Sequence, residues 1–280
     1  MSDAVAVPAQ PVWMHGTLMA ADAAVVPLAD RGFTLGDGVF ETLLWRGGGP
    51  DPGPQRFMAH MARLSHAASS LGLCSRLDPD WLRTGIAAVC QPAGADQAVR
   101  ITLSRGVAPR GLAVPEEPQP LFVITAAPHR PAGPVRNLVR TGIARAPGAP
   151  SARFKTLSYI DNVEALRQAR AAGGDDGLLL GSAGQPVCAC AANLIVARSG
   201  TLLTPPVSDG ALPGITRGAL VAAGLVREAP LDWSDLADSD AIITTNALTG
   251  PRPVMAFEGR LLSGSVAMAE RLARALREDD

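Results

Sequence analysis

The strongest periodic pattern in the chain lies at residues 56–73, where apolar side chains recur every three or four positions. This spacing places them on one face of a helix. The apolar face consists of Phe57, Met61, Leu64, Ala68 and Leu71. A second helix is predicted over 78–91, and the C-terminal run GSVAMAERLARALRE is predicted to form an amphipathic helix.

Strands are predicted where short apolar runs are bounded by glycine and other turn residues. In the first half of the chain, the segment 12–19 is expected to form a hairpin. Further strands are expected at 38–45, 98–105 and 121–127. Helices combined with mostly sequential strands indicate an α+β arrangement for this half.

The second half also mixes strands and helices. Strands are predicted at 135–142 and 240–246, and shorter ones in the runs DGLLLG, VCACAANLIVAR and TLLTPP. A helix over 215–224 is predicted after a Pro-Gly pair, and Asp161 is interpreted as the N-cap of another helix.

A cluster of proline and glycine, PHRPAGP at 128–134, is the best candidate for a domain boundary. We therefore predict a smaller α+β domain over 1–127, an interdomain linker over 128–134 and a larger domain over 135–280. The predicted fold class is a two-domain α+β or α/β protein.

The composition excludes several classes of protein. The 280 residues are 47% hydrophobic, which is enough for one large domain or two smaller ones. A net charge of −1 gives no electrostatic case for a nucleic-acid partner. No apolar run approaches the roughly 20 residues that a membrane helix needs, and the start MSDAVAVPAQ does not resemble a signal peptide. We therefore expect a cytoplasmic protein that has neither a nucleic-acid partner nor a membrane partner.

Four cysteines are too few for a disulfide scaffold in a chain of this length, so buried free thiols are expected. Cys188 and Cys190 alternate on a predicted strand, which would place both thiols on one face. No second Cys or His pair stands at a suitable spacing, so no metal site is predicted.

Lys155 is the only lysine in the chain, and it therefore carries the only side-chain amine available for imine chemistry. It lies in the uncharged, partly apolar segment FKTLSYI, just ahead of a predicted helix. Such a setting can desolvate an amine and lower its pKa. The alternative is an ordinary surface lysine.

Several other polar groups are candidates for binding. The run Gly214-Ile215-Thr216-Arg217 lies at a predicted helix start, where free backbone N–H groups can bind an anion. Arg56 lies at the start of the helix predicted over 56–73, on one stripe with His60 and Arg63, and it can reach a phosphate bidentately. For Arg63 we favour a solvated position.

The loop SRGVAPRGL carries Arg105 and Arg110, each followed by a glycine. Loop arginines of this kind can swing over a pocket and clamp a carboxylate. The alternative is a charged loop that faces solvent.

These motifs together resemble the fold-type IV pyridoxal-phosphate enzymes, also called class IV aminotransferases. The resemblance is collinear from about residue 16 to residue 260. It is carried by the segments ADRGFTLGDGVFETL, RFMAHMARL, SRGVAPRGL, ANL at 192–194, GITR at 214–217 and TNALTGPRPV at 245–254, with Lys155 in family order. Among the members, the segments SRGVAPRGL and ANL are most similar to those of aminodeoxychorismate lyases.

The resemblance implies the cofactor pyridoxal 5'-phosphate and a D-amino-acid-aminotransferase-like fold. It also implies roles for individual residues. Lys155 would be the catalytic Schiff-base lysine, and Arg110 and Phe40 would contact the substrate. The residues implied in cofactor binding are Arg56, Lys155, Tyr159, Cys188, Asn193, Ile215, Thr216, Ala247 and Leu248. A homodimer acting on a small amino substrate is implied as well.

Two positions depart from the family pattern. Cys188 stands where the family has a glutamate that pairs with the protonated pyridine nitrogen of the cofactor. A neutral thiol would give a weaker electron sink, which favours an elimination driven by aromatisation over general transamination. A thiolate would serve if the charge of the ring lowered the pKa of the thiol. Leu112 replaces a histidine of D-amino-acid aminotransferases.

The favoured function is therefore that of a 4-amino-4-deoxychorismate lyase, which forms 4-aminobenzoate and pyruvate. An aminotransferase acting on D-amino acids or branched-chain amino acids is the alternative. A non-catalytic protein that binds the cofactor or a metabolite is the alternative of another class.

Overall fold

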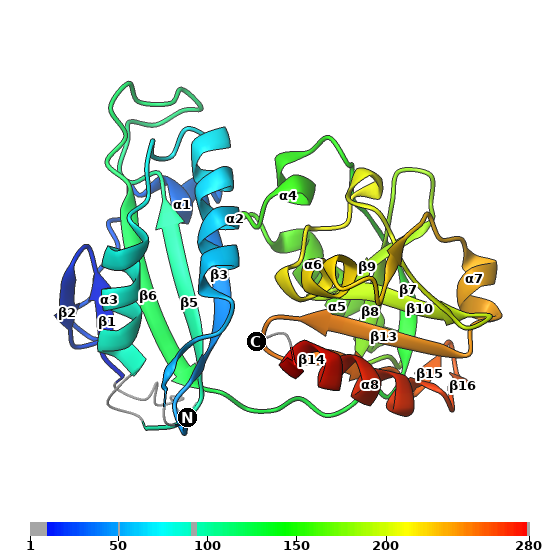
Figure 1. The fold of residues 1–280 in the computed structure, drawn as a ribbon. Coiled ribbons are helices and arrows are strands. Elements are labelled where there is room, and N and C mark those ends of the chain that lie inside the picture. The colour runs from blue at the N-terminus through cyan, green and yellow to red at the C-terminus, as the bar shows by residue number, and fades with distance from the viewer. Residues whose placement is uncertain (1–9, 50, 91–93, 279–280) are drawn as a thin grey trace, which may run out of the picture. The chain divides into compact units, whose positions relative to one another are not determined.

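The computed structural model describes residues 10–49, 51–90 and 94–278, and the chain divides into two compact units. Unit 1 ends at His129 and unit 2 begins at Arg130. Both units mix α-helices and β-strands (Figure 1). The mixed fold predicted from the sequence is confirmed.

The described strands of unit 1 form a six-stranded sheet in the order β2-β1-β6-β5-β3-β4. The strands are β1 (Val12–Met14), β2 (Thr17–Met19), β3 (Gly38–Arg46), β4 (Gly53–Pro54), β5 (Gln97–Ser104) and β6 (Leu121–Pro128). The hairpin and the three longer strands predicted for this half are confirmed. The helices are α1 (Arg31–Leu35), α2 (Phe57–Ser70) and α3 (Pro79–Cys90).

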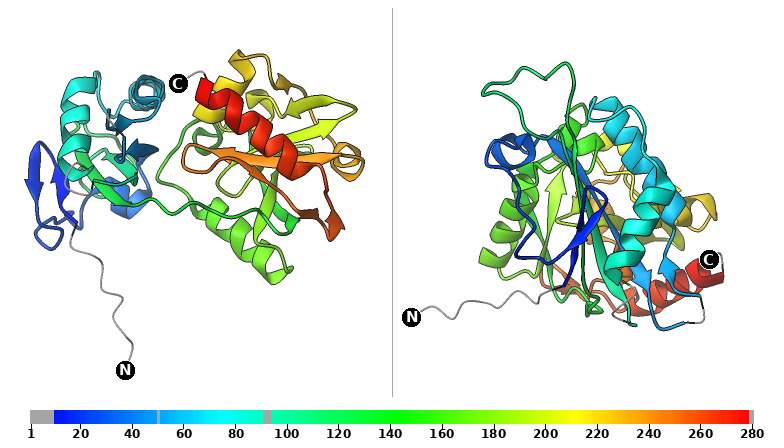
Figure 2. Two further views of the ribbon diagram at one scale, coloured as in Figure 1. Left: turned by 60° about the horizontal axis from the view of Figure 1, so that its bottom comes forward. Right: turned by 90° about the vertical axis from the view of Figure 1, so that its left-hand side faces the viewer.

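Helices α2 and α3 cover the sheet of unit 1 (Figure 2). Phe57, Met61, Leu64 and Ala68 of the apolar face predicted on α2 are buried. The prediction of a helix from the spacing of these residues is confirmed. Helix α3 lies against β1 and β6. There Gly85 is required, because a Cβ would come within 2.7 Å of the Trp13 ring.

A buried ionic cluster joins α2 to β3. Arg63 donates two hydrogen bonds to the Glu41 carboxylate, both of 2.7 Å, and His60 Nδ1 lies 2.8 Å from Glu41 Oε2. Glu41 and His60 are each only 1% exposed. The sequence-based placement of Arg63 on a solvated face was therefore wrong, because Glu41, 22 residues away in sequence, faces the same buried site.

The described strands of unit 2 form a ten-stranded sheet. They are β7 (Leu138–Ala144), β8 (Asp176–Leu180), β9 (Pro186–Ala189), β10 (Asn193–Arg198), β11 (Thr201–Thr204), β12 (Arg227–Glu228), β13 (Ala241–Asn246), β14 (Gly250–Pro253), β15 (Ala256–Phe257) and β16 (Arg260–Leu261). The helices are α4 (Pro150–Arg153), α5 (Ile160–Ala171), α6 (Ile215–Ala222), α7 (Trp233–Ala237) and α8 (Ser265–Glu278), with a 3₁₀ turn at Val207–Asp209.

Strand β10 separates two apolar clusters of unit 2. Ile195 and Ala197 pack with residues of α6 and α8, whereas Leu194 and Val196 pack in the opposite cluster. This alternation follows from the two-residue period of a strand. Asn193 shares the parity of Ile195 and therefore begins the strand on the α6 side.

One cap assignment from the sequence was wrong. Asp161 lies inside the first turn of α5, and the N-cap is Tyr159. A carboxylate in the first turn still faces the positive end of the helix dipole, which explains why the residue type suggested a helix start.

We predict that Glu41→Gln destabilises unit 1 by about 3–5 kcal/mol at pH 7, because one partner of a buried charge cluster is lost. Burial opposes ionisation of Glu41, but hydrogen bonds from His60 and Arg63 outweigh it and lower the pKa. The stabilisation is thus present above the unfolded pKa of about 4.3 and is lost as the pH falls through the lower folded pKa.

Urea unfolding at several pH values measures this difference. The control is Asp96→Asn, which removes the exposed pair with Arg46 and should cost at most about 1 kcal/mol. A difference between wild type and Glu41→Gln that stays constant down to pH 2 would contradict the prediction.

Candidate active site

Lys155 lies in the segment between α4 and α5. Its amine is half-buried and hydrogen-bonds to the Tyr159 hydroxyl at 3.4 Å. The same nitrogen lies 5.1 Å from the centre of the Tyr159 ring. The structure therefore brings these two predicted residues together at the start of α5.

Helix α5 connects this lysine to the strand that carries Cys188. The Asn162 side-chain amide, in the first turn of α5, donates a 2.6 Å hydrogen bond to the Cys190 carbonyl. Cys190 directly follows β9, in which Cys188 is 5% exposed. The first turn of α5 and the end of β9 are thus fixed to each other.

Three buried side chains follow one another across neighbouring strands of unit 2. Cys188 of β9 is the register partner of Asn193 of β10, and Asn193 is the register partner of Thr245 of β13. Directly opposed residues of antiparallel strands point to the same side of a sheet. The thiol, the amide and the hydroxyl therefore share the face on which α6 lies.

Asn193 also fixes the start of α6. Its amide nitrogen donates a 2.8 Å hydrogen bond to the Leu212 carbonyl. A Cβ on Gly214 would lie only 1.9 Å from the Asn193 amide oxygen, so the close approach requires glycine there. The N-cap of α6 is Gly214, which has no side chain that could accept a hydrogen bond. The first backbone N–H groups of the helix, including those of Ile215 and Thr216, therefore have no side-chain cap.

Arg145 ties the lysine segment to the segment before α6. It follows β7 and is 9% exposed. Its guanidinium donates to the Ser151 carbonyl at 2.5 Å and to the Gly210 carbonyl at 3.1 Å. One buried cation therefore holds both segments from which Lys155 and Ile215 project.

The turn after β13 contains Ala247 and Leu248. The Asn246 side chain accepts hydrogen bonds from the backbone of Leu248 at 3.0 Å and of Thr249 at 2.9 Å. Its amide donates to the Ala191 carbonyl at 3.2 Å. The turn is thereby held beside the segment that links β9 to β10.

Three predicted site residues belong to unit 1. Arg56 is half-buried and adopts a left-handed backbone with φ 47° immediately before α2. A non-glycine residue seldom adopts this conformation, and such strain is typical of functional positions. Phe40 is buried on β3, with the Arg100 guanidinium 3.7 Å from its ring centre. Arg110 is exposed and lines a cavity of about 420 Å³.

The expectation that Arg105 swings over a pocket was wrong. Its guanidinium is buried and binds the Asp37 carboxylate at 2.7 Å and the carbonyls of Leu71 and Gly72 at 2.9 and 2.8 Å. Only Arg110 of the two loop arginines is exposed. The pattern Arg-Gly occurs twice in this loop, and tertiary contacts decide which of the two arginines is buried.

Each cysteine is a free thiol, and Cys90, Cys188 and Cys190 are buried. Burial raises the pKa of the Cys188 thiol to about 11, and the nearby Asp176 carboxylate opposes ionisation further, although the charge of Arg145 partly offsets it. The thiol is therefore neutral near pH 7. Burial also raises the pKa of Cys190.

Thr245, Thr156 and Arg145 were not among the site residues predicted from the sequence. The hydroxyls of Thr156 and Thr245 are buried without a hydrogen-bond partner in the part of the chain that the structure describes. An unpaired buried hydroxyl is unusual and marks a place where a bound group can supply the partner. The available signal was the position of Thr245 next to the NALTG segment and of Thr156 next to the only lysine.

Comparisons with known proteins identify the family of the chain. The model of the family "Amino-transferase class IV" matches residues 38–257. A bifunctional aminodeoxychorismate lyase / D-amino acid transaminase of Mycobacterium tuberculosis is 28% identical over 90% of this chain and 92% of its own length.

Solved structures give the same result. The 4-amino-4-deoxychorismate lyase of Pseudomonas aeruginosa is 28% identical, with a TM-score of 0.80 over 96% of this chain and 98% of that chain. A branched-chain aminotransferase of Thermoproteus uzoniensis is 25% identical, with a TM-score of 0.85 over 95% and 94% of the two chains.

The chain belongs to the class IV aminotransferase family. It is an enzyme with the fold-type IV architecture and depends on pyridoxal phosphate. The described residues fit that cofactor chemically. They supply an amine, free amides at the start of α6, and unpaired buried hydroxyls.

The part of the chain that the structure describes has neither a membrane-spanning helix nor a cluster of metal ligands. No helix there is long and apolar enough to cross a membrane. No group of three or more histidine, cysteine or acidic side chains there is placed to hold a metal ion.

We predict that Gly214→Ala destabilises unit 2 by about 1–3 kcal/mol, because the new Cβ overlaps the Asn193 amide. It should also weaken cofactor binding, since α6 must shift. Thermal unfolding and equilibrium dialysis with pyridoxal phosphate measure the two effects.

The matched control is Gly218→Ala in the same helix, where a Cβ would meet nothing within 4 Å. That exchange should stabilise the helix by about 0.5–1 kcal/mol and leave cofactor binding unchanged. Equal effects of the two substitutions would show that the Asn193 contact does not matter.

Proposed function

We propose that this enzyme is a 4-amino-4-deoxychorismate lyase, which converts its substrate to 4-aminobenzoate and pyruvate. The observation that carries the proposal is the buried, neutral thiol of Cys188, at the position where the family has a glutamate. The 28% identity to both a bifunctional lyase and a solved lyase supports it.

In this proposal, the residues predicted from the sequence hold the cofactor. Lys155 would hold the cofactor through its amine, and Tyr159, which contacts that amine, would lie beside the cofactor. The amides of Ile215 and Thr216, the turn at Ala247 and Leu248, and Arg56 bind the phosphate, because free N–H groups at a helix start and a guanidinium both favour an anion. Asn193 and Cys188 border the ring, and the unpaired Thr245 hydroxyl supplies a further donor.

Lys155 performs two tasks in turn. It would hold the cofactor, and its free amine would remove the proton from the substrate carbon that bears the substrate amine. Because the same amine holds the cofactor and acts as the base, no second basic group has to be positioned beside the substrate. When bound, pyridoxal phosphate supplies the electron sink for the resulting negative charge.

The neutral thiol makes elimination the more favourable outcome. Cys188 cannot hold a positive charge on the pyridine nitrogen, so negative charge at the substrate carbon is stabilised less. Expulsion of pyruvate forms an aromatic ring, and this driving force does not depend on a strong sink. Transamination forms no aromatic ring, so nothing offsets the weaker stabilisation of the negative charge.

An aminotransferase activity is the second candidate. The similarity to the branched-chain aminotransferase of Thermoproteus uzoniensis and to D-alanine aminotransferases of Listeria supports it. Against the D-amino-acid form, Leu112 replaces a histidine and is 83% exposed.

We also propose a homodimer. Unit 1 exposes large apolar side chains near the Arg110 loop, including Leu28 at 80%, Phe33 at 70% and Leu112 at 83%. A cluster of this kind is typical of a surface that another protein covers. In the dimer, Arg110 and Phe40 would contact the substrate.

The decisive experiment measures two things: the covalent bond between Lys155 and the cofactor, and the formation of 4-aminobenzoate. Borohydride treatment of the purified, cofactor-loaded enzyme should fix the cofactor to Lys155, as read by peptide mass spectrometry, and Lys155→Ala should abolish both the bond and turnover. Chorismate with ammonia and a supplying synthase should yield 4-aminobenzoate, whereas amino acids with a keto acid should react more slowly. Faster transamination than lysis would overturn the lyase proposal.

Cys188→Glu should raise the transaminase rate by about tenfold, on the scale of one charge-assisted interaction. Cys188→Ser, which keeps a neutral side chain of similar size, should leave that rate unchanged. Thermal unfolding of both variants shows whether they remain folded. If folded Cys188→Glu transaminates no faster than the wild type, the weak-sink argument is wrong.

A further inference from the structure

The loop that carries Arg110 is closed at its base by direct backbone contact. Gly106 adopts φ 85°, and a Cβ there would lie 1.8 Å from the Gln119 carbonyl oxygen. The Arg31 amide donates to the Gly106 carbonyl at 2.9 Å, and Val107 forms a bridge with Asp30. Residues 106–119 therefore form one closed loop on unit 1.

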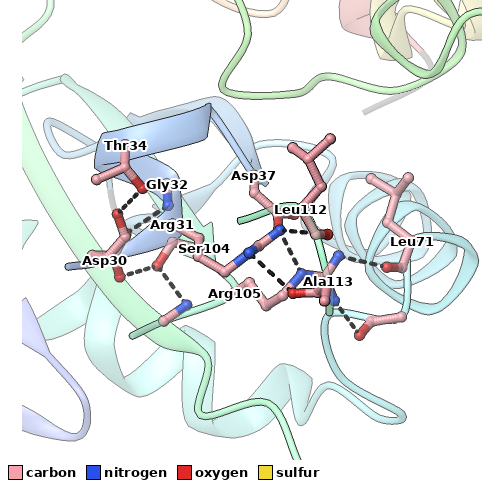
Figure 3. A network of polar contacts seen from close by, with 12 residues as sticks. Asp30, Arg31, Gly32, Thr34, Asp37, Leu71, Ser104, Arg105, Leu112 and Ala113 are labelled. Carbon is pink, nitrogen blue, oxygen red and sulfur yellow. Dashed lines mark hydrogen bonds and ion pairs between the residues drawn. The ribbon is translucent and has the colours of Figure 1, made fainter. Parts of the chain in front are cut away.

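The middle of this loop is held by a single buried cation (Figure 3). Arg31 Nη1 donates to the carbonyls of Gly111 at 3.0 Å and Ala113 at 3.2 Å, and Nη2 donates to the Leu112 carbonyl at 3.4 Å. The Arg31 side chain is only 6% exposed. Three successive carbonyls thus converge on one guanidinium.

Apolar packing within unit 1 does little to hold the loop. The side chains of Leu112 and Val114 are 83% and 55% exposed. A cavity of about 420 Å³, lined by α1 and by loop residues from Ala108 to Gly111, lies against the loop. The hydrogen bonds of Arg31 are therefore the main contacts of its central part.

Arg31 is itself held rigidly. Its Nε donates to Asp37 Oδ2 at 2.8 Å, and Arg105 donates to the same oxygen at 2.7 Å. Burial opposes ionisation of Asp37, but hydrogen bonds from Arg105 and Arg31 outweigh it and lower the pKa. Arg105 continues the network to the carbonyls that follow α2. The anchor is thus connected to the rigid part of unit 1.

We propose that Arg31 is a positioning residue for substrate binding: by holding the carbonyls of Gly111, Leu112 and Ala113 it fixes the backbone next to Arg110, and so sets where the Arg110 guanidinium meets a substrate carboxylate. The inference rests on the proposed role of Arg110. The anchor must be arginine, because a planar guanidinium offers several donors in fixed directions whereas an ammonium acts as a point charge.

Arg31→Lys keeps the positive charge beside Asp37 but cannot donate hydrogen bonds to the three carbonyls of residues 111–113 at once. In the cofactor-loaded enzyme, amide exchange in residues 108–118 should become about tenfold faster, and KM for 4-amino-4-deoxychorismate should rise about tenfold, the scale of a lost charged hydrogen bond. The kcat should change less than about threefold, and the visible absorbance of the bound cofactor should not change. Arg76→Lys, the same exchange at an exposed position of unit 1, should alter none of these quantities.

Gly111→Ala provides a second variant that leaves Arg31 in place. Gly111 has φ 113° and an open surrounding, so a Cβ strains the backbone without a steric clash. It should shift the anchored carbonyl and raise KM in the same way. If both variants loosen the loop and leave KM unchanged, the positioning role is wrong.

The double variant Arg31→Lys/Arg110→Gln separates this inference from the proposed function. If Arg31 acts through Arg110, the double variant should have a KM within about twofold of Arg110→Gln alone, whereas independent effects would multiply. If Arg110→Gln alone leaves KM unchanged while Arg31→Lys still accelerates exchange, the proposed role of Arg110 fails and this inference falls with it. Formation of 4-aminobenzoate by the wild type would still support the proposed lyase function in that case.

Discussion

The contact between the Asn193 amide and the Gly214 backbone is the constraint on which the site of unit 2 depends. Asn193 begins β10 on the side of the sheet that α6 covers, and its amide oxygen occupies the space that any larger residue at 214 would need. This approach sets where the free amides of α6 lie relative to Cys188 and Thr245. The start of the helix can therefore be an anion site of defined position.

Buried cations hold the remaining loops of both units. Arg145 joins the segments that precede Lys155 and α6, and Arg31 and Arg105 join the Arg110 loop to the end of α2 through Asp37. In each case the arginine binds backbone carbonyls of segments that are far from it in sequence or lie beyond the end of its own strand. Hydrogen bonds from a charged donor are among the stronger ones, so a few of them can fix a loop that buries little apolar surface. The chain has 25 Lys and Arg residues and a single lysine, and the tertiary structure uses several of these arginines structurally.

The chemistry at Cys188 follows from its burial. A thiol enclosed by apolar residues and close to Asp176 remains protonated at neutral pH. The protein groups around Cys188 in unit 2 thus favour the thiol over the thiolate. The proposed lyase reaction rests on this neutral group, because the resemblance to the family implies a carboxylate at the position.

The sequence by itself determined the elements and the family. Periodicity located α2, α3 and the long strands of unit 1, because the side chains of a helix and of a strand repeat at different intervals, and the collinear motifs identified the class IV aminotransferase family. The family motifs also predicted Lys155, Tyr159, Asn193 and the start of α6 as parts of the site. Tertiary structure alone decided that Arg63 is half-buried against Glu41, that Arg105 is buried, and that Cys188 is neutral. It also decided that Thr245, Arg145 and Arg31 lie beside the proposed functional groups. These properties depend on partners that are distant in sequence, such as Glu41 for Arg63, and no local pattern records which distant residue will share a buried site.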